Sequence, residues 1–358
     1  MPSRFLPTHN SPTHELTHAK VGWHGGYNFS LGIKKTDTKM NYKIIWIIFG
    51  LIINNLELFS QTKISDKQEI YGVWSKQNSP YIIEGEAIIP IGKTLTIESG
   101  VVIKFKTDES TERSFIKISE HTSNFGYLRI KGQIIANGSE NDKIIFTRLG
   151  DEKYWGIILF DRSSDTCRLS HCKIEYANDL NPCIDSSVYN QASGAISFQR
   201  TEKPILIEYC EITKCDQGIN CINSKNVHIE YCLIHNNASL GIYNGYTSEL
   251  VVNHCTLFNN QFSAYISKTE IKNTIIWTEN DECGFYANPG INCENSIIKG
   301  YYDLCNSCFD KNPRFVNAKR LDFRLRKSSP CRNKGINHSK GFTSEDNTDI
   351  GAIQFKTT

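Results

Sequence analysis

Three stretches of this chain repeat one pattern. IEYCEITKC (207–215), IEYCLIHNN (229–237) and VNHCTLFNN (252–260) start 22 and 23 residues apart, and each has a cysteine at its fourth position. Similar lines precede and follow them, with threonine or serine in the same place. The equivalent positions, here called the cysteine column, are Cys172, Cys210, Cys232, Cys255, Thr274 and Ser296. Self-similarity at such a period indicates a repeat architecture.

The repeated lines have the chemistry of strands. They alternate apolar and polar residues and are rich in Ile, Val, Tyr and Thr, which disfavours helical repeats. The apolar parity switches between Ile229 and Cys232, so the chain must bend near Tyr231 for both sets to face one interior. A glycine-containing marker such as GAISF (194–198) precedes each line and supplies a third strand. Three strands per period predict an all-β, single-stranded parallel β-helix, a solenoid of stacked coils.

Asparagine pairs follow two of the lines. Asn236 with Asn237, and Asn259 with Asn260, stand where the chain must turn. Asparagine tolerates the left-handed conformation that such turns require. Stacked coils would also let these amides hydrogen-bond to one another from coil to coil.

The chain resembles the secreted right-handed parallel β-helix proteins of the pectate-lyase-like superfamily. TLTIESGVVIKF (94–105) is similar to their opening coils and WGIILF (155–160) to the next ones. NPRFVNAKRLDFRLRKSSPCRNKGI (312–336) with DIGAIQF (349–355) is similar to their closing module, although Cys331 and Arg332 replace a small residue and an acid. The resemblance implies a right-handed solenoid with terminal capping segments in a bacterial protein. The functions of that superfamily are diverse.

The pattern divides the chain into five segments. Residues 1–39 are interpreted as a disordered extension or an upstream misread, with translation starting at Met40. Residues 40–61 are predicted to be a signal peptide, with the apolar run 44–53 and cleavage after Ser60. That run is too short to span a membrane, which takes about 20 residues. Residues 62–84 are expected to form an N-terminal cap, 85–300 the β-helix and 301–358 a C-terminal closing module.

Location and partners follow from the signal and the charge. The signal predicts an extracellular or cell-surface protein, with the periplasm as the alternative and no membrane span in the mature chain. A formal charge of +2 over 358 residues gives no basic field for a nucleic acid. A flat parallel face suits an extended polymer better than a compact metabolite, so a polysaccharide or cell-surface glycan is the expected partner.

A column of rings immediately precedes the cysteine column. It contains His171, Tyr209, Tyr231 and His254, followed by two asparagines. Two interpretations are open for these rings. They form platforms for pyranose faces, or they stack on one another, because aromatic pairs on neighbouring strands stabilise a sheet.

One coil contains an insertion. Between the cysteine position and the next glycine marker there are 22 residues, where later coils use 8 to 10. Insertions of solenoids lie on one face and often form the binding side. Asp179, Asp185 and Arg162 are therefore candidate catalytic residues of a lyase acting on a uronate, and Tyr189 is a further candidate ligand contact. A solvated polar loop is the alternative.

Other site signatures are weaker. Asp161 and Asp165 are candidate oxygen ligands for Ca²⁺, the one cofactor considered. The chain contains neither the Asp-Asp pair nor the Gly-His-Gly of polygalacturonases. Glycoside hydrolysis needs two carboxylates facing one bond, and the sequence pairs none.

Thirteen cysteines follow a secretory signal, which invites a disulfide interpretation. Cysteines stacked on neighbouring parallel strands have Cβ atoms about 4.8 Å apart, beyond the roughly 3.5–4.5 Å of a disulfide. Cys210, Cys232 and Cys255 are therefore predicted to be small buried apolar residues, interchangeable with Thr274 and Ser296. Away from the cysteine column, Cys305 with Cys308 and Cys283 with Cys293 are candidate local disulfides.

Three functions remain open from the sequence. The first is a secreted or surface protein that binds polysaccharide through its rod face. The second is a polysaccharide lyase or related carbohydrate-active enzyme. The third is a non-catalytic structural or adhesive rod.

Overall fold

The computed structural model describes residues 61–107, 125–151, 154–178, 193–245, 248–279, 284–288, 290–300, 307–336 and 348–354. The interpretation of residues 1–39 and of the signal peptide up to Ser60 falls outside these ranges. In the part that the structure describes, no helix is long and apolar enough to cross a membrane.

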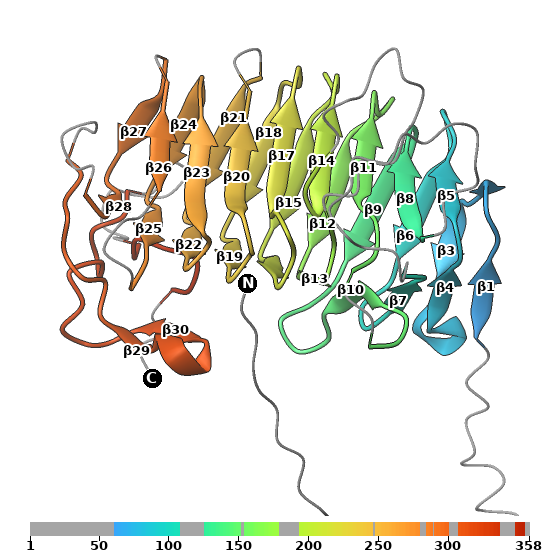
Figure 1. Ribbon diagram of the computed structural model, residues 1–358, viewed down its shortest axis with the longest axis horizontal. Helices are drawn as coiled ribbons and strands as arrows, with labels where there is room; N and C mark the ends of the chain where they lie inside the picture. Colours follow the sequence, from blue (N-terminus) through green and yellow to red (C-terminus); the bar gives the residue numbers. More distant parts are fainter. Residues whose placement is uncertain are drawn as a thin grey trace, which may run out of the picture. The chain divides into compact units, whose positions relative to one another are not determined.

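Strands form three long parallel sheets around a rod (Figure 1). In the ten-stranded sheet, called sheet A, the strands are β1 (Thr62–Ile64), β4 (Tyr81–Ile83), β7 (Val102–Phe105), β10 (Ile144–Arg148), β13 (Cys172–Glu175), β16 (Glu211–Thr213), β19 (Leu233–His235), β22 (Thr256–Phe258), β25 (Ile275–Trp277) and β28 (Ile297–Ile298). Sheet B contains β2 (Gln68–Glu69), β5 (Glu86–Ile89), β8 (Tyr127–Ile130), β11 (Ile158–Asp161), β14 (Ile196–Gln199), β17 (Ile219–Ile222), β20 (Leu240–Asn244), β23 (Phe262–Ile266) and β26 (Phe285–Ala287).

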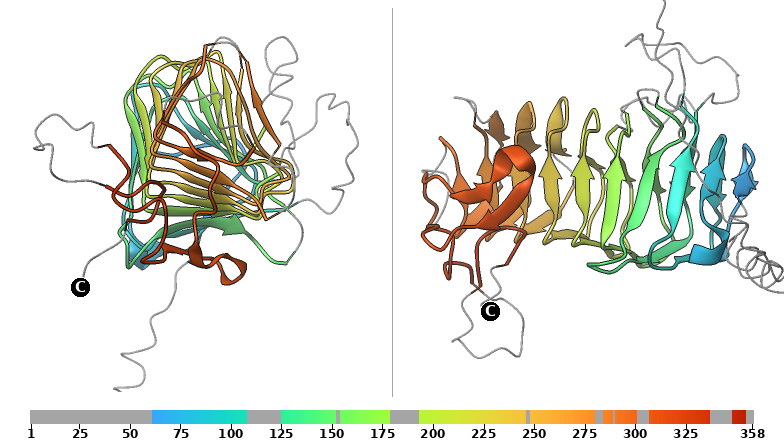
Figure 2. Two further views of the ribbon diagram at one scale, coloured as in Figure 1. Left: turned by 90° about the vertical axis from the view of Figure 1, so that its left-hand side faces the viewer. Right: turned by 90° about the horizontal axis from the view of Figure 1, so that it is seen from below.

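Sheet C completes each coil. Its strands are β3 (Gly72–Trp74), β6 (Thr94–Ile97), β9 (Gln133–Asn137), β12 (Cys167–Ser170), β15 (Ile205–Glu208), β18 (Val227–Glu230), β21 (Leu250–Asn253), β24 (Thr269–Lys272) and β27 (Asn292–Glu294). Each strand pairs in parallel with the third strand before and after it, so every turn of chain lies on the previous turn. Viewed along the rod, the coils lie one behind another (Figure 2). The predicted parallel β-helix is confirmed.

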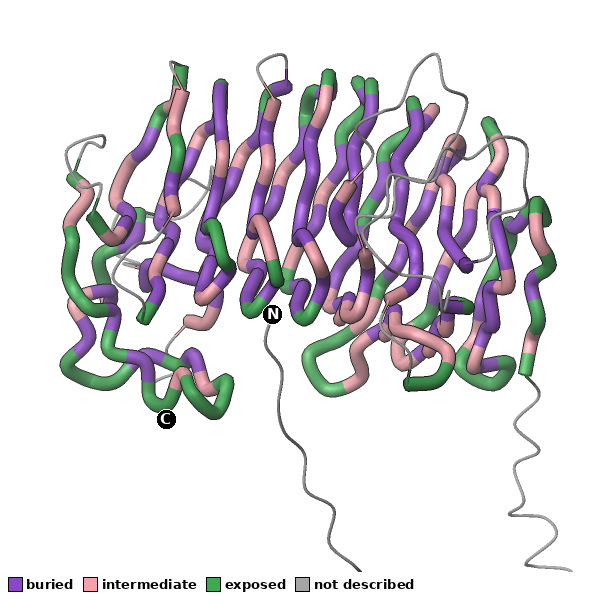
Figure 3. Tube along the Cα trace, viewed as in Figure 1, coloured by how far each residue is buried: buried purple, intermediate pink, exposed green. Residues whose placement is uncertain are grey.

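The core is a set of columns of inward-facing side chains. Ile174, Ile212 and Ile234 occupy equivalent positions of β13, β16 and β19, and all are fully buried. Figure 3 shows the buried residues following the strands from coil to coil. The glycine of the marker is also explained, because a Cβ at Gly218 or Gly241 would clash with the carbonyl oxygen of the next coil. The period of the sequence is thus the period of the core.

A left-handed residue makes the corner between sheets C and A. The residue before each cysteine position has a positive φ, from 45° to 51°, and the set is His171, Tyr209, Tyr231, His254, Asn273 and Asn295. This is the bend predicted near Tyr231. Asparagine adopts this conformation readily, whereas a ring does so at a cost. The corner therefore favours asparagine locally, and rings at this position need a compensating contact.

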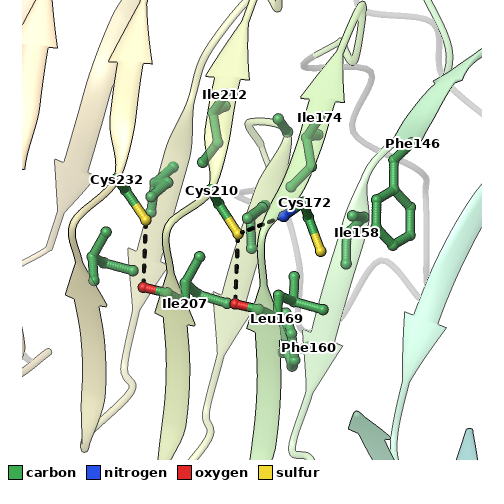
Figure 4. Packing of buried hydrophobic residues seen from close by; sticks show 14 of the residues in the cluster. Phe146, Ile158, Phe160, Leu169, Cys172, Ile174, Ile207, Cys210, Ile212 and Cys232 are labelled. Carbon is green, nitrogen blue, oxygen red and sulfur yellow. Dashed lines mark hydrogen bonds between the residues drawn. The ribbon is translucent and has the colours of Figure 1, made fainter. Parts of the chain in front are cut away.

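The cysteine column provides hydrogen bonds at this corner (Figure 4). Cys210 Sγ donates to Glu208 O at 3.2 Å and accepts from Cys172 N at 3.4 Å. Thr274 Oγ1 occupies the same place, donating to Lys272 O at 2.7 Å and accepting from Cys255 N at 3.2 Å. Cys210, Cys232 and Cys255 are free thiols, as predicted, and so is Cys172. Their description as apolar residues was incomplete, because each thiol donates a hydrogen bond to a backbone carbonyl oxygen.

Asparagines line the next corner, between sheets A and B. Asn237 Nδ2 donates to Asn260 Oδ1 at 2.9 Å, and the same oxygen accepts from Asn237 N at 3.1 Å. Asn237 Oδ1 in turn accepts from Cys215 N at 3.0 Å. The left-handed residues at this corner include Asn236 and Asn259. The predicted stacking of asparagine amides from coil to coil is confirmed.

The closing module packs on the outer face of sheet A. It contains the antiparallel pair β29 (Phe315–Asn317) and β30 (Asp322–Leu325), which the 3₁₀ turn η3 (Ala318–Arg320) joins. The other short 3₁₀ turn, η1 (Lys76–Asn78), belongs to the first coils. A second hydrophobic cluster joins the module to the last coils, and its buried members are Phe258, Ile275, Ile297, Phe315, Phe323, Leu325, Cys331 and Ile350.

The cysteine column predicts an unequal response to substitution at Cys210. Serine keeps a donor and an acceptor at the corner, whereas alanine leaves Cys172 N and two carbonyl oxygens without that partner. We expect Cys210→Ala to be less stable than Cys210→Ser by about 1–3 kcal/mol, the cost of unmade buried hydrogen bonds. Urea unfolding followed by circular dichroism measures the difference. Equal stability of the two variants would contradict a hydrogen-bonding role for this column.

Candidate functional site

The outer face of sheet B has one continuous row of side chains. Register pairs the central outward residue of each strand with that of the next, and the row is Arg129, Leu159, Ser197, Asn220, Tyr243, Tyr265 and Tyr286. Six inter-strand steps of about 4.8 Å make this row roughly 29 Å long. A feature of this length and direction matches a ligand that runs along the rod.

The last three members of this row form what we call the tyrosine row. The rings of Tyr243 and Tyr265 are stacked, with centroids 5.4 Å apart and planes 12° apart. Tyr286 follows at 6.3 Å and is tilted by 39°, and its side chain is 54% exposed. Phe262, also exposed, lies 6.2 Å from Tyr286. These rings form an exposed aromatic surface that covers three coils.

Buried polar side chains lie along the same face, and we call Ser197, Gln199 and Asn220 the polar row. Gln199 is 3% exposed, and neither its Oε1 nor its Nε2 has a hydrogen-bond partner among the described residues. Ser197 Oγ is likewise buried without a partner in those ranges. Each such atom costs about 1–3 kcal/mol. Both side chains are closed off from solvent, so they are not directly available to a ligand.

The predicted insertion rejoins the rod at the polar row. Ser193 is the first described residue after it, and Ser193 Oγ accepts a hydrogen bond from Asn220 Nδ2 at 2.8 Å. The three candidate site residues that the insertion itself contains, namely Asp179, Asp185 and Tyr189, lie outside the described residues. Ser193 thus contacts sheet B, the sheet that carries the tyrosine row.

An ion cluster begins the row at the N-terminal end. Arg129 donates to Asp161 Oδ2 through Nε at 2.9 Å and Nη2 at 2.6 Å, and its Nη1 donates to Glu86 Oε1 at 3.3 Å. Burial and the charge of Glu86 raise the pKa of the neighbouring Tyr127 hydroxyl. Two carboxylates already neutralise this guanidinium, so the cluster fastens β5, β8 and β11 together.

This arrangement bears on the other predicted site residues. Arg162 is exposed and has φ 50° at the end of β11. Asp161 is buried in the ion pair with Arg129, whereas Asp165 is exposed and its Oδ1 accepts from Thr166 N at 2.7 Å. In the described ranges, no group of three or more acidic, histidine or cysteine side chains is arranged to hold a metal ion. Asp161 is thus committed to Arg129 and does not join Asp165 in a calcium site.

The predicted ring column is a ladder of stacked rings at the left-handed corner. His171 and Tyr209 lie 4.8 Å apart, Tyr209 and Tyr231 4.9 Å, and Tyr231 and His254 4.7 Å, with planes within 17° of parallel. Tyr209 is the most exposed ring, at 42%. Because the inner faces lie against one another, mainly ring edges are left for solvent. The geometry corresponds to the stacking interpretation.

His254 is not available to a ligand. It is 2% exposed, and its Nδ1 lies 3.0 Å from Asp349 O in the closing module. The prediction of His254 as a ligand contact is therefore wrong. The covering residues are 95 positions further along the chain, so the repeat pattern contained no sign of them.

The tyrosine row was missed by the sequence analysis, although a signal was present. The glycine markers GIYNG (241–245), SAYI (263–266) and GFYA (284–287) each place a tyrosine at the third position. The parity of a strand puts that position on the face opposite to the residues before and after it. Aligning the markers by parity would have identified the row.

The two predicted disulfides, Cys283–Cys293 and Cys305–Cys308, have different outcomes. Cys293 is disulfide-bonded, and its predicted partner Cys283 lies outside the described residues. Cys308 is a free thiol, which contradicts the predicted Cys305–Cys308 disulfide. Cys308 Sγ lies 3.6 Å from Cys293 Sγ, and burial raises the pKa of Cys308 to about 11. The spacing of two cysteines in the sequence did not determine which sulfur atoms meet across coils.

A histidine and a glutamate meet at the edge of the closing module. His235 Nε2 lies 3.4 Å from Glu211 Oε1, and His235 Nδ1 lies 3.0 Å from Asn236 Nδ2. Because an amide nitrogen donates, Nδ1 accepts and Nε2 carries the proton given to Glu211. This hydrogen bond lowers the pKa of Glu211 from 4.5 to about 2, together with an ion pair in which Lys143 Nζ lies 3.2 Å from Glu211 Oε2. The ring of Phe323 in β30 is tilted against the ring of His235, with the two ring centroids 5.1 Å apart.

The pair predicts a dependence of stability on pH. The folded-state pKa of Glu211 lies below its unfolded value, so its contribution is complete above about pH 4.5 and is lost as the pH falls towards 2. Glu211→Gln should lower the free energy of unfolding at neutral pH by on the order of 2 kcal/mol and flatten its decline over this interval. Urea unfolding at a series of pH values measures both effects.

Glu202→Gln is the matched control, because Glu202 is exposed and forms no ion pair with a described residue. An unchanged pH profile for Glu211→Gln would show that the Glu211–His235 contact does not stabilise the fold.

Comparison with known proteins places the fold in a class. The parallel ladder defines a parallel β-helix, and the family model of the right-handed β-helix region matches residues 156–300. The chain thus has the right-handed parallel β-helix fold, and the resemblance to this class is confirmed. No curated protein matches. Among solved structures, the crystal structure of pectate lyase Pel9A is similar, with 12% identity and a TM-score of 0.45, covering 83% of this chain and 86% of that chain.

Proposed function

We propose that this protein is a secreted or surface-displayed binding protein whose rod engages an extended polysaccharide along the outer face of sheet B. The observation that carries the proposal is the tyrosine row, in which Tyr243, Tyr265 and Tyr286 follow one another on the outer face of sheet B over three successive coils. Tyrosine rings supply apolar faces for sugar rings and hydroxyls for sugar oxygens.

The direction of the row supports a polymer as the ligand. A tyrosine recurs on three successive strands, about 4.8 Å apart, so a chain lying along the rod meets the same kind of group at each of these steps. A compact metabolite would meet only one or two of them. Ser193, the first described residue after the insertion, accepts a hydrogen bond from Asn220 of the same outward row.

Binding without turnover is favoured over a lyase by the described chemistry. Arg129 is neutralised by Asp161 and Glu86, and Arg162 is exposed at the strand end. A lyase needs a free base and a group that polarises the uronate at one place, and the candidates that would complete it are among the residues outside the described ranges. Absorbance of unsaturated uronates during incubation with acidic polysaccharides tests the point directly.

The tyrosine row predicts a loss of binding on substitution. Tyr265→Ala with Tyr286→Ala should weaken retention by polysaccharide in affinity gel electrophoresis by roughly fivefold for each ring removed, because an aromatic contact contributes about 1 kcal/mol. Tyr71→Ala is the matched control, because Tyr71 is an exposed tyrosine of the first coils.

Two outcomes would contradict this assignment. Loss of retention in Tyr209→Ala with normal retention in the double variant would move the site to the ring ladder at the corner. A folded wild-type protein that no polysaccharide retards would favour a purely structural or adhesive rod.

The location outside the cell rests on residues 40–60. We expect the exported protein to begin at Gln61, with the signal removed. N-terminal sequencing of protein collected from the medium or the cell envelope of a secreting host measures this. A chain that stays in the cytoplasm with residues 40–60 attached would contradict secretion and, with it, an extracellular ligand.

A further inference from the structure

A pocket separates the closing module from the last coils of the rod. Its volume is about 700 Å³, within the usual range for small-molecule sites. The residues that line it are Phe258, Trp277, Glu279, Asn312, Arg314, Phe315, Val316, Asn317, Ala318, Lys319, Arg326 and Ser328. They come from β22 and β25 of sheet A, from β29 and η3 of the module, and from residues that flank these elements and β30. The pocket lies on sheet A and is therefore separate from the row on sheet B.

The wall of the pocket combines apolar rings with cations. Phe258 and Phe315 are buried ring neighbours with centroids 5.7 Å apart, and Trp277 stands half-buried beside them with Lys299 Nζ 5.5 Å from its ring centroid. Arg314, Lys319 and Arg326 provide three positive charges against the single carboxylate of Glu279, a net charge of 3 − 1 = +2 for the lining.

The two guanidinium groups are held in place by backbone oxygens. Arg326 Nε donates to Phe315 O and Nη2 to Val316 O, both at 3.0 Å, and Arg314 Nη1 donates to Ser328 O at 3.0 Å. All three acceptors belong to residues that line the pocket. An arginine has five N–H donors, so most of the donors stay available to a ligand.

These cations differ from three other arginines of the described chain. Arg129, Arg168 and Arg324 each pair with a carboxylate. Within the described residues, Arg314, Lys319 and Arg326 pair with none. The side chains of Asn312 and Asn317 use their oxygens to accept from backbone N–H groups, which leaves their amide N–H groups as further donors. The pocket is thus rich in donors and poor in acceptors.

We propose that this pocket binds an anionic saccharide, that is, a sugar unit bearing a carboxylate or a sulfate. The anionic group pairs with Arg314 and Arg326, where a planar guanidinium fits two oxygens at once. The apolar face of the sugar ring packs against Trp277. An inorganic anion would leave the aromatic wall unused, and a neutral apolar ligand would leave the cations unused. The site is independent of the polysaccharide row on sheet B.

Isothermal titration calorimetry on the full chain tests the proposal with four probes: a uronic-acid disaccharide, a sulfated disaccharide, a neutral disaccharide and inorganic sulfate. We expect one anionic disaccharide to bind and the neutral one not to bind, with affinity falling as salt is added. Which anionic disaccharide binds identifies the charged group. Arg314→Gln should weaken binding at least tenfold, the size expected for a lost charge-assisted hydrogen bond.

Variants separate the pocket from general charge. Arg324→Gln removes an exposed arginine of the same hairpin that does not line the pocket, and it should leave binding unchanged. Trp277→Leu keeps an apolar side chain at the wall but should weaken binding and abolish the ligand-induced change in tryptophan fluorescence. Circular dichroism verifies that each variant is folded. Tyr265→Ala with Tyr286→Ala should bind normally, so failure at sheet B and failure at this pocket are distinguishable.

The contrary results are equally definite. Absence of binding by both anionic disaccharides, binding of inorganic sulfate alone, or equal binding of the neutral disaccharide would overturn the proposal. So would an affinity that Arg314→Gln and Trp277→Leu leave unchanged.

Discussion

The corner between sheets C and A is repeated in every complete coil of the described rod from β12 onward, and the rest of the structure depends on how its backbone groups are satisfied. One residue turns the chain through a left-handed conformation, and the next residue hydrogen-bonds to the backbone with its side chain. Cysteine, threonine and serine meet this requirement, because each carries a small donor and acceptor on Cβ. Valine or alanine would fit the space without satisfying the backbone groups. The repetition of cysteine is therefore explained by hydrogen bonding as well as by size.

The same corner accounts for the ladder of rings. A ring in a left-handed conformation is locally unfavourable, whereas Asn273 and Asn295 are suited to it. The stacking of His171 to His254 at 4.7 to 4.9 Å compensates for this cost, and each ring stabilises its neighbours. Rings that the fold itself explains are weak evidence for a ligand. The side chains that the fold does not explain are the exposed tyrosines and the buried polar side chains of sheet B.

The repetitive part of the structure could be read from the sequence, whereas contacts between distant segments could not. Period and parity predicted the bend at Tyr231, the unbridged cysteine column and the asparagine ladder through Asn237, because each is a contact between equivalent positions of adjacent coils. The burial of His254 depends on Asp349, which no repeat relates to it. The free thiol of Cys308 beside Cys293 has the same origin. The tyrosine row lay within reach, because the glycine markers carry it at a constant position.

The outer face of sheet A shows why the closing module belongs to the fold. Moving along one outward row from β16 to β28, polar Glu211 gives way to Leu233, Thr256, Ile275 and Ile297. The largely apolar outer surface of the last coils would be exposed to solvent if nothing covered it. Phe315, Phe323 and Leu325 of the closing module cover it. The strands of the last described coil are only two or three residues long, so their ladder adds little stability. The disulfide of Cys293 and the module together stabilise this end by means other than coil stacking. A hairpin that packs on the side of a rod need not be complementary in shape to the whole of that surface. The gap that remains beside Trp277 is lined by cations of the closing module.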